Sequence, residues 1–371
     1  MMRMKNEQQI ENEFIKKLID LKYVYREDIR DKFSLEENFR KHFERLNRVK
    51  LRDSEFIRLR DSIINPDVFE NAKKLREINT FKRDDDTPLQ YTLVNLKNWC
   101  KNEFEVVNQL RINTENSNHR YDVILLINGI PVVQIELKRR GVRLQKAFNQ
   151  LHRYSKESFN SENSLYKYIQ IFVISNGTYT RYFANTTAQN KNHYEFTCEW
   201  ADRKNKTIHD LEDFTVTFLS KRVLLEVLTK YCVFDADNTL LIMRPYQIAA
   251  TESILRKIHS TNEMKNFGTI NACGYIWHTT GSGKTLTSFK TARLATELDY
   301  IDKVIFVVDR KDLDYQTMKE YQKFQPNSVN GSNNTKELQR SIEENDDRIV
   351  VTTIQKLNKF ITANPNHEIY S

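Results

Sequence analysis

Three residues near the middle of the chain have the types and spacing of a site that could cleave a phosphodiester. Asp122 lies in one apolar run, and Glu136 and Lys138 lie at the end of the next. Residues i and i+2 of a strand point to one face, so Glu136 and Lys138 would point together, with Asp122 on the paired strand. Two carboxylates so placed can share a Mg²⁺ ion, while Lys138 stabilises the developing negative charge. Alone, Glu-x-Lys is a weak signal, because half-buried strands often carry it on a wet face.

Two neighbouring features favour the nuclease interpretation. Gln150 and Tyr154 form a Gln-x-x-x-Tyr pattern on the helix expected after this strand, and the i, i+4 spacing puts both on one helix face. The run Lys138-Arg139-Arg140 places positive charges where backbone phosphates would pass, although a solvated strand end would look the same. We therefore expect Asp122, Glu136 and Lys138 to be catalytic, with Gln150 and Tyr154 in support.

A second candidate site is a phosphate-binding loop that lies between a short apolar segment and an amphipathic helix. It reads His278-Thr-Thr-Gly-Ser-Gly-Lys-Thr. Its glycines let successive N–H groups point at phosphate oxygens, and the following helix adds its dipole. Lys284 would hold the β- and γ-phosphates of ATP, and Thr285 would supply a hydroxyl to Mg²⁺. His278 stands where the general pattern has Gly, but the GxGKT of helicase-like motors is intact. The expected nucleotide contacts are Thr280, Gly281, Ser282, Gly283, Lys284 and Thr285.

Three flanking motifs resemble elements of superfamily 2 helicases. Arg244-Pro-Tyr-Gln247 resembles the adenine-reading element, in which a Gln amide pairs with the base. Phe306-Val-Val-Asp309-Arg310 with Leu313 and Gln316, and later Val351 to Gln355, resemble two elements near the DNA track. The ordered matches favour an ATP-driven motor that uses Gln247 for the base.

The acidic residues needed for ATP hydrolysis do not follow any expected strand. Asp346-Asp347 precede a strand instead, and no second motor lobe follows before Ser371. From the sequence we expect ATP binding without turnover.

The apolar pattern predicts the elements that position these residues. Helical spacing of Ile10, Phe14, Leu18 and Leu21 begins a mostly helical lead, broken by a solvated turn at Asp84 to Pro88. Strands at 106–107, 123–127 and 130–137 include a hairpin with an Asn-Gly turn; a helix at 144–158 and a strand at 168–175 follow. A helix at 221–231 closes a first domain, 1–235.

The second domain, 236–371, alternates helices with short apolar strands. Helices are expected at 246–258 and 285–298, and strands at 275–277, 304–308 and 348–352. Trp277 is expected to lie in the core. This order predicts a parallel α/β sheet.

Composition and charge suit a globular protein with a polyanionic partner. The 371 residues are 39% hydrophobic and 29% charged, with a formal net charge of +8, which agrees with nucleic-acid binding without proving it. The four cysteines have no zinc-ligand or disulfide spacing and are expected to be reduced and buried. No signal peptide or membrane-spanning run is present, so a cytoplasmic location is expected.

The motifs together resemble the motor and cleavage (R) subunit of type I restriction enzymes (HsdR). NGIPVVQIELKRRG with Gln-x-x-x-Tyr resembles PD-(D/E)xK nucleases of the RecB-like type, and RPYQ, HTTGSGKT and FVVDRKDLDYQ resemble the motor. The resemblance implies an α/β fold: a PD-(D/E)xK mixed sheet with N-terminal helices, then a partial RecA-like parallel lobe. It also implies ATP-driven translocation and cleavage of double-stranded DNA, assembly with methylation (M) and specificity (S) subunits, and an N-terminal fragment of the whole subunit.

The resemblance leaves some assignments open. The first helix of similar nucleases often supplies a carboxylate to the metal, which would be Glu11, although a surface position is the simpler interpretation. Other functions remain alternatives: a RecB-like or type III-like helicase-nuclease, or a DNA-binding scaffold with vestigial sites.

Overall fold

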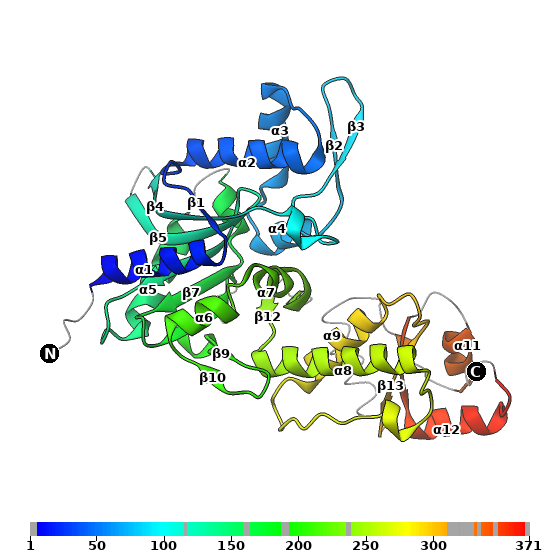
Figure 1. Cartoon of the computed structure of the whole chain (residues 1–371). Coiled ribbons are helices and arrows are strands. Elements are labelled where there is room, and N and C mark those ends of the chain that lie inside the picture. The colour runs from blue at the N-terminus through cyan, green and yellow to red at the C-terminus, as the bar shows by residue number, and fades with distance from the viewer. Residues whose placement is uncertain are drawn as a thin grey trace. The chain divides into compact units, whose positions relative to one another are not determined.

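The structure, a computed structural model, divides the chain into two compact units. It describes residues 6–114, 117–158, 164–186, 193–234, 239–309, 319, 330–331, 335–343 and 348–367. The first unit comprises Met1–Cys232 with Thr239–Ile242, and the second comprises Val233–Asn238 with Met243–Ser371. Figure 1 draws both units, and each is described by itself.

A six-stranded mixed sheet is the centre of the first unit, with the strand order β1-β4-β5-β6-β7-β8. The pairs β4–β5, β5–β6 and β7–β8 are antiparallel, whereas β1–β4 and β6–β7 are parallel. The strands are β1 (Val24–Tyr25), β4 (Phe104–Thr114), β5 (Ser117–Ile127), β6 (Ile130–Leu137), β7 (Ile171–Ser175) and β8 (Thr180–Ala184). The expected β-β-α-β order is confirmed, and the sheet is mixed.

The turn between β5 and β6 is set by its two residues. Asn128 has φ 51° and Gly129 has φ 77°, the left-handed pair that a tight hairpin turn requires. A Cβ on Gly129 would lie 2.6 Å from the Cα of Phe39, so no side chain fits there. The turn pairs Ile127 with Ile130, and a register shift between Leu125 and Leu126 then pairs Val123 with Ile135, which places Asp122 beside Glu136.

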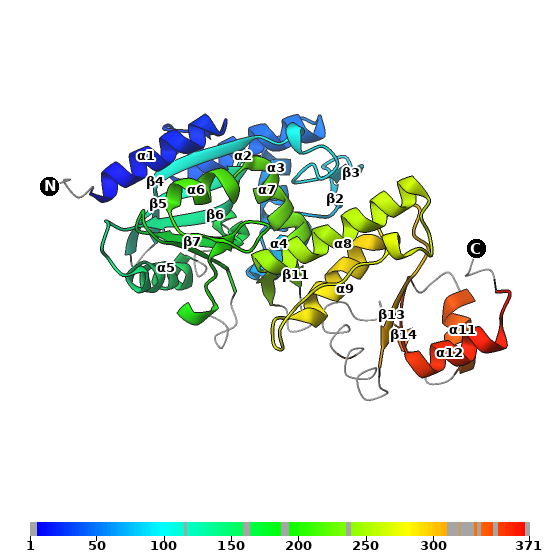
Figure 2. The ribbon, with the colours of Figure 1, turned by 60° about the horizontal axis from the view of Figure 1, so that its bottom comes forward.

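The helices of the first unit bury apolar stripes. Ile10, Phe14 and Leu18 of α1 are buried as their spacing predicts. The helix α5 connects the parallel strands β6 and β7, a connection that needs a crossover (Figure 2). The bounds are α1 (Glu7–Asp20), α2 (Lys32–Asn47), α3 (Asp53–Ile63), α4 (Val68–Lys74), α5 (Leu144–Ser158), α6 (Leu211–Thr217) and α7 (Lys221–Glu226), which continues as a π-helical turn, Val227–Tyr231.

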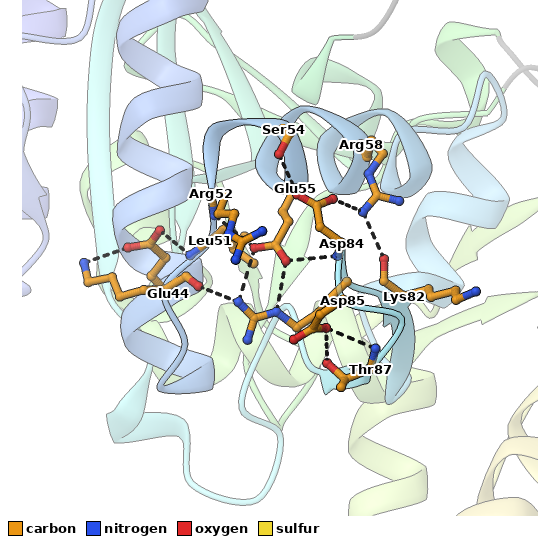
Figure 3. Close-up of polar contacts among 12 residues, drawn as sticks. Glu44, Leu51, Arg52, Ser54, Glu55, Arg58, Lys82, Asp84, Asp85 and Thr87 are labelled. Carbon is orange, nitrogen blue, oxygen red and sulfur yellow. Dashed lines mark hydrogen bonds and ion pairs between the residues drawn. The ribbon is translucent and has the colours of Figure 1, made fainter.

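A β-hairpin interrupts the helical lead. Its strands are β2 (Asn79–Lys82) and β3 (Pro88–Tyr91), and the acidic run Asp84 to Asp86 forms its turn, as predicted. Nε of Arg83 donates to Oε1 of Glu55 of α3. Figure 3 shows that Arg58 of α3 reaches Asp84. These contacts attach the hairpin to α3 and give Asp84 of the acidic run a structural partner.

Two further two-stranded sheets lie outside the six-stranded sheet. The strands β9 (Trp200–Ala201) and β10 (Thr207–Ile208) form one two-stranded sheet. Another consists of β11 (Cys232–Phe234) and β12 (Leu240–Ile242).

The second unit contains a parallel sheet with the described order β13-β15-β14. The prediction of a parallel α/β arrangement is therefore confirmed for these strands. The strands are β13 (Val304–Val308), β14 (Asn330–Gly331) and β15 (Ile349–Thr353), and the helices are α8 (Pro245–Met264), α9 (Lys284–Ala295), α11 (Thr335–Glu343) and α12 (Ile354–Ala363).

The prediction of a strand at 275–277 is wrong. These residues are irregular, and Tyr275 and Trp277 are each 88% exposed, so Trp277 is not a core residue. A strand needs a neighbour for its N–H and C=O groups, and the described strands of this unit pair with one another instead.

The cysteine prediction was partly wrong. None of the four described cysteines is in a disulfide, but Cys100 and Cys273 are exposed, Cys198 is half-buried and only Cys232 is buried. Within the described ranges, no helix is both long and apolar enough to cross a membrane.

Candidate functional site

The hairpin β5–β6 brings Asp122, Glu136 and Lys138 together. Oδ2 of Asp122 accepts from the backbone N–H of Leu137 over 2.9 Å. Nζ of Lys138 donates to Oε1 of Glu136 over 2.6 Å, and the Lys138 side chain is 13% exposed. Glu136 is fully buried, which contradicts the alternative of a wet strand face. Its Oε2 has no hydrogen-bond partner among the described residues.

Burial opposes ionisation of both carboxyl groups. It raises the pKa of Asp122 to about 6, although the Leu137 N–H and the Lys138 charge act in the other direction. Burial, followed by the charge of Asp122, raises the pKa of Glu136 to about 8. Burial alone would lower the pKa of Lys138, but the Glu136 carboxylate outweighs it and the pKa is raised. The raised pKa values mean that the two carboxyl groups do not readily ionise together beside the single ammonium of Lys138.

Glu11 of α1 is buried, contrary to the simpler expectation of a surface position. Nδ2 of Asn108 donates to its Oε1 and Nε2 of Gln109 donates to its Oε2, each over 2.6 Å. Gln109 of β4 has φ 56° and lies opposite Asp122 of β5, between the pairs Asn108↔Val123 and Leu110↔Tyr121. The charge of Glu11 contributes to the raised pKa of Asp122. Apart from the adjacent Asn108 and Gln109, no sequence pattern indicates this two-amide clamp on Glu11.

Gln150 and Tyr154, the residues expected to support the site, both lie on α5. Gln150 lies half-buried on α5, and Tyr154 lies on the same helix, but the side chain of Tyr154 is outside the described part of the structure. Arg139 and Arg140 are exposed directly after β6, and the N–H of Arg139 donates to Oε1 of Glu7 over 3.3 Å. This basic cluster faces solvent, where a phosphate backbone could reach it.

The two carboxyl groups fit a divalent cation. A buried carboxylate oxygen without a partner, beside a second carboxyl of raised pKa, is the donor set that a hard cation would complete. Mg²⁺ is commonly held by one or two protein carboxylates, with substrate phosphate oxygens and waters in the other positions. No group of three or more His, Cys, Asp or Glu side chains is poised for a metal within the described ranges. The fit therefore rests on Asp122 and Glu136.

The phosphate-binding loop precedes α9. Gly281 and Gly283 have φ of 76° and 79°, which a glycine adopts readily, and Lys284 begins the helix. Nζ of Lys284 is directed back at the carbonyl of Thr279 over 3.5 Å and the side chain is exposed. Thr285 follows in the first turn, and Thr280 and Ser282 lie in the loop itself.

The predicted base-reading residue lies against this loop. Oε1 of Gln247 accepts from the N–H of Arg244 over 2.8 Å, and its Nε2 donates to the carbonyl of Ser282 over 3.0 Å. The first contact caps α8, a purely structural role that any Gln at this position could have. The second contact joins two motifs that are 35 residues apart.

Two further motifs also meet. Nε2 of Gln355 at the start of α12 donates to the carbonyl of Asp309 after β13, over 3.1 Å. Arg310, Leu313, Gln316 and the pair Asp346-Asp347 lie outside the described residues.

Comparison with known families assigns the first unit. Residues 4–191, more than half of the chain, match the family of the type I restriction enzyme R protein N terminus. The chain therefore belongs to the type I restriction enzyme R protein family. Residues 246–370 of this R protein match the SWI2/SNF2 ATPase family.

Individual relatives carry matching names. The R protein is 43% identical to a type I restriction enzyme endonuclease subunit of Staphylococcus saprophyticus over 91% of its own length, and 40% identical to one of Staphylococcus aureus over 98%. It spans only 35% and 38% of those two proteins. The EcoprrI endonuclease subunit of Escherichia coli is 47% identical, with 69% of this chain and 83% of that protein covered.

Proposed function

We propose that this chain carries the DNA-cleaving site and the ATP-binding loop of a type I restriction enzyme R subunit. The first unit would be a PD-(D/E)xK nuclease domain, within 1–235. The second, within 236–371, would be the first RecA-like motor lobe. In the whole protein, cleavage of double-stranded DNA would be coupled to ATP-driven translocation. The M and S subunits would be its partners.

The observation that carries the nuclease proposal is the state of Glu136. A fully buried carboxylate with one unpartnered oxygen, 2.6 Å from a lysine and beside Asp122, is costly unless a cation completes it. A surface ion pair would not require such burial. The burial of this carboxyl group with an unpartnered oxygen therefore supports a metal-binding role over a purely structural one.

The roles of the residues follow from these positions. Asp122 and Glu136 would hold Mg²⁺, which when bound polarises the phosphodiester and activates water. Lys138, held by Glu136, would stabilise the negative charge that develops on the phosphoryl oxygens. Water adds across one P–O bond, which leaves one phosphate end and one hydroxyl end. Gln150 and Tyr154 would support this site from α5, and Arg139 and Arg140 would contact the backbone.

The nucleotide proposal rests on the loop and on Gln247. Thr280 to Thr285 would surround the phosphates of ATP, with Mg²⁺ held at Thr285. The described strand ends β13 and β15 are followed by Asp309 and by α12 rather than by an acidic pair. These residues would therefore bind ATP without hydrolysing it unless acids from elsewhere complete the site.

Metal titration tests the nuclease proposal directly. Calorimetry with Mg²⁺ or Mn²⁺ should show binding to the wild-type chain and none to Asp122→Ala. Asp202→Ala, at an exposed acid of the β9–β10 turn, is the matched control and should bind like the wild type. Supercoiled plasmid incubated in parallel reports any nicking. Absence of metal binding and of nicking in the wild type would favour the scaffold alternative instead.

A further inference from the structure

Two side chains of α8 donate hydrogen bonds to one carbonyl oxygen of the phosphate-binding loop. The hydroxyl of Tyr246 donates to the carbonyl oxygen of Ser282 over 2.9 Å, and Nε2 of Gln247 donates to the same atom over 3.0 Å. A carbonyl oxygen has two lone pairs, so these donors use both. The loop is thereby attached to α8 through a single oxygen atom.

This attachment fixes the direction of the next N–H group. In a planar trans peptide, the C=O of Ser282 and the N–H of Gly283 point in opposite directions. With the oxygen directed at α8, the Gly283 N–H points away from α8. Phosphate-binding loops work through such N–H groups, and a flipped peptide would present a carbonyl oxygen to the phosphate instead. Holding this oxygen is therefore a requirement of phosphate binding.

His278 supports Tyr246 from the other side. The two rings pack edge to face, with centroids 5.5 Å apart and planes at 89°, a favoured geometry for aromatic pairs. His278 is the position at which this loop departs from the general phosphate-loop pattern. The departure therefore has a structural consequence, because the imidazole of His278 packs against the phenol of Tyr246, whose hydroxyl binds the loop.

Gln247 has a different task from that of Tyr246. Its Oε1 accepts from the N–H of Arg244 and its Nε2 donates to Ser282, which fixes the orientation of the amide. One lone pair and one N–H remain, and these match the N6 donor and N7 acceptor of adenine but not the two acceptors of guanine. A Cβ at Gly283 would lie 2.4 Å from Nε2 of Gln247, so this close approach requires glycine.

We infer that Tyr246, supported by His278, is a positioning residue for the nucleotide phosphates. It keeps the Ser282–Gly283 peptide in the phosphate-binding orientation, while Gln247 selects the base. The inference rests on the proposed ATP-binding function. The two side chains therefore have different roles. Loss of the Tyr246 hydroxyl should weaken the binding of every phosphate ligand, and loss of the Gln247 amide should also remove the preference for adenine.

Binding of three ligands distinguishes these roles in the 371-residue chain. ATP, GTP and inorganic tripolyphosphate are titrated into wild type, Tyr246→Phe, Gln247→Ala and the control Tyr300→Phe. Tyr300 also has a side-chain hydroxyl contact in this unit, to His259 over 3.2 Å, and among the described residues no hydrogen bond joins it to the loop. Tyr246→Phe should weaken the binding of all three ligands about fivefold, as expected for the loss of one hydrogen bond. The ratio of the affinity for ATP to the affinity for GTP should not change. Gln247→Ala should remove the preference for ATP over GTP, and Tyr300→Phe should bind all three ligands like the wild type.

Two results would overturn the inference in different ways. Wild-type affinity of Tyr246→Phe for tripolyphosphate would overturn the role of Tyr246 and leave ATP binding intact. A wild-type chain that binds neither ATP nor tripolyphosphate would overturn the nucleotide site as well. A purely structural role would lower the melting temperature without changing tripolyphosphate affinity. His278→Ala repeats the test with the hydroxyl retained and should weaken tripolyphosphate about twofold.

Discussion

Burial and mutual repulsion oppose the ionisation of Asp122 and Glu136, and this opposition links the candidate nuclease site to the stability of its unit. The pKa of Glu136 rises from an ordinary 4.5 to about 8, so the native state binds more protons than the unfolded state between these values. The contribution of Glu136 to stability is therefore greatest below about pH 4.5 and is lost as the pH rises toward 8. A bound cation would reverse this loss by pairing with the charged form.

Glu136→Gln tests this linkage at one residue. The amide cannot ionise, so without metal the variant should melt about 4 °C or more above the wild type at pH 8, and close to it at pH 4.5. Calorimetric melting at both pH values measures the difference, with the exposed Glu195→Gln as control. Saturating Mg²⁺ should stabilise the wild type and not the variant. An equal gain at both pH values would indicate packing rather than ionisation.

The turn between β5 and β6 has a similarly specific requirement at the scale of elements. Gly129→Ala forces a Cβ to within 2.6 Å of the Phe39 backbone at φ 77°, whereas Gly141, at φ 85°, has open space around it. Gly141→Ala should cost about 1 kcal/mol from backbone strain alone. Gly129→Ala should cost about 3 kcal/mol or more, since overpacking adds to that strain. Urea unfolding measures both, and equal costs would contradict the close approach.

The hairpin β2–β3 depends on the ionised form of Glu55. The Arg83 side chain and the N–H of Arg52 lower the pKa of this carboxyl to about 2, so its stabilisation is present above about pH 4.5 and is lost as the pH falls through 2. Glu55→Gln should therefore lower the urea midpoint clearly at pH 7 and hardly at all near pH 2. Glu77→Gln, at an exposed acid beside the same hairpin, should change neither midpoint.

Elements with strong local signals were predictable from the sequence, and those that depend on distant partners were not. Strand alternation and the Asn-Gly turn predicted the hairpin β5–β6, because both signals act within a few residues. They did not predict the register shift that aligns Asp122 with Glu136. The segment around Trp277 has a strand-like composition, but no described strand pairs with it. The clamp on Glu11 comes from Asn108, 97 residues away, so no periodicity could indicate it.

For the whole molecule, the two candidate sites lie in different compact units with separate cores. The Asp122–Lys138 site depends on the six-stranded sheet of the first unit, and the phosphate loop depends on α8 and α9 of the second. A substitution in one site should therefore leave the other site folded.

This separation predicts an asymmetry between two lysines in the full-length assembly. Lys138→Ala should lower DNA cleavage by about 100-fold or more while ATP turnover continues, because the loss concerns charge stabilisation at the phosphodiester. Lys284→Ala should abolish both activities, since cleavage that needs translocation also needs ATP. Plasmid cleavage and phosphate release, measured on the same preparations, give both activities for each of the two variants. Cleavage that persists in Lys138→Ala would remove this lysine from the site, and ATP turnover that persists in Lys284→Ala would remove the loop from nucleotide binding.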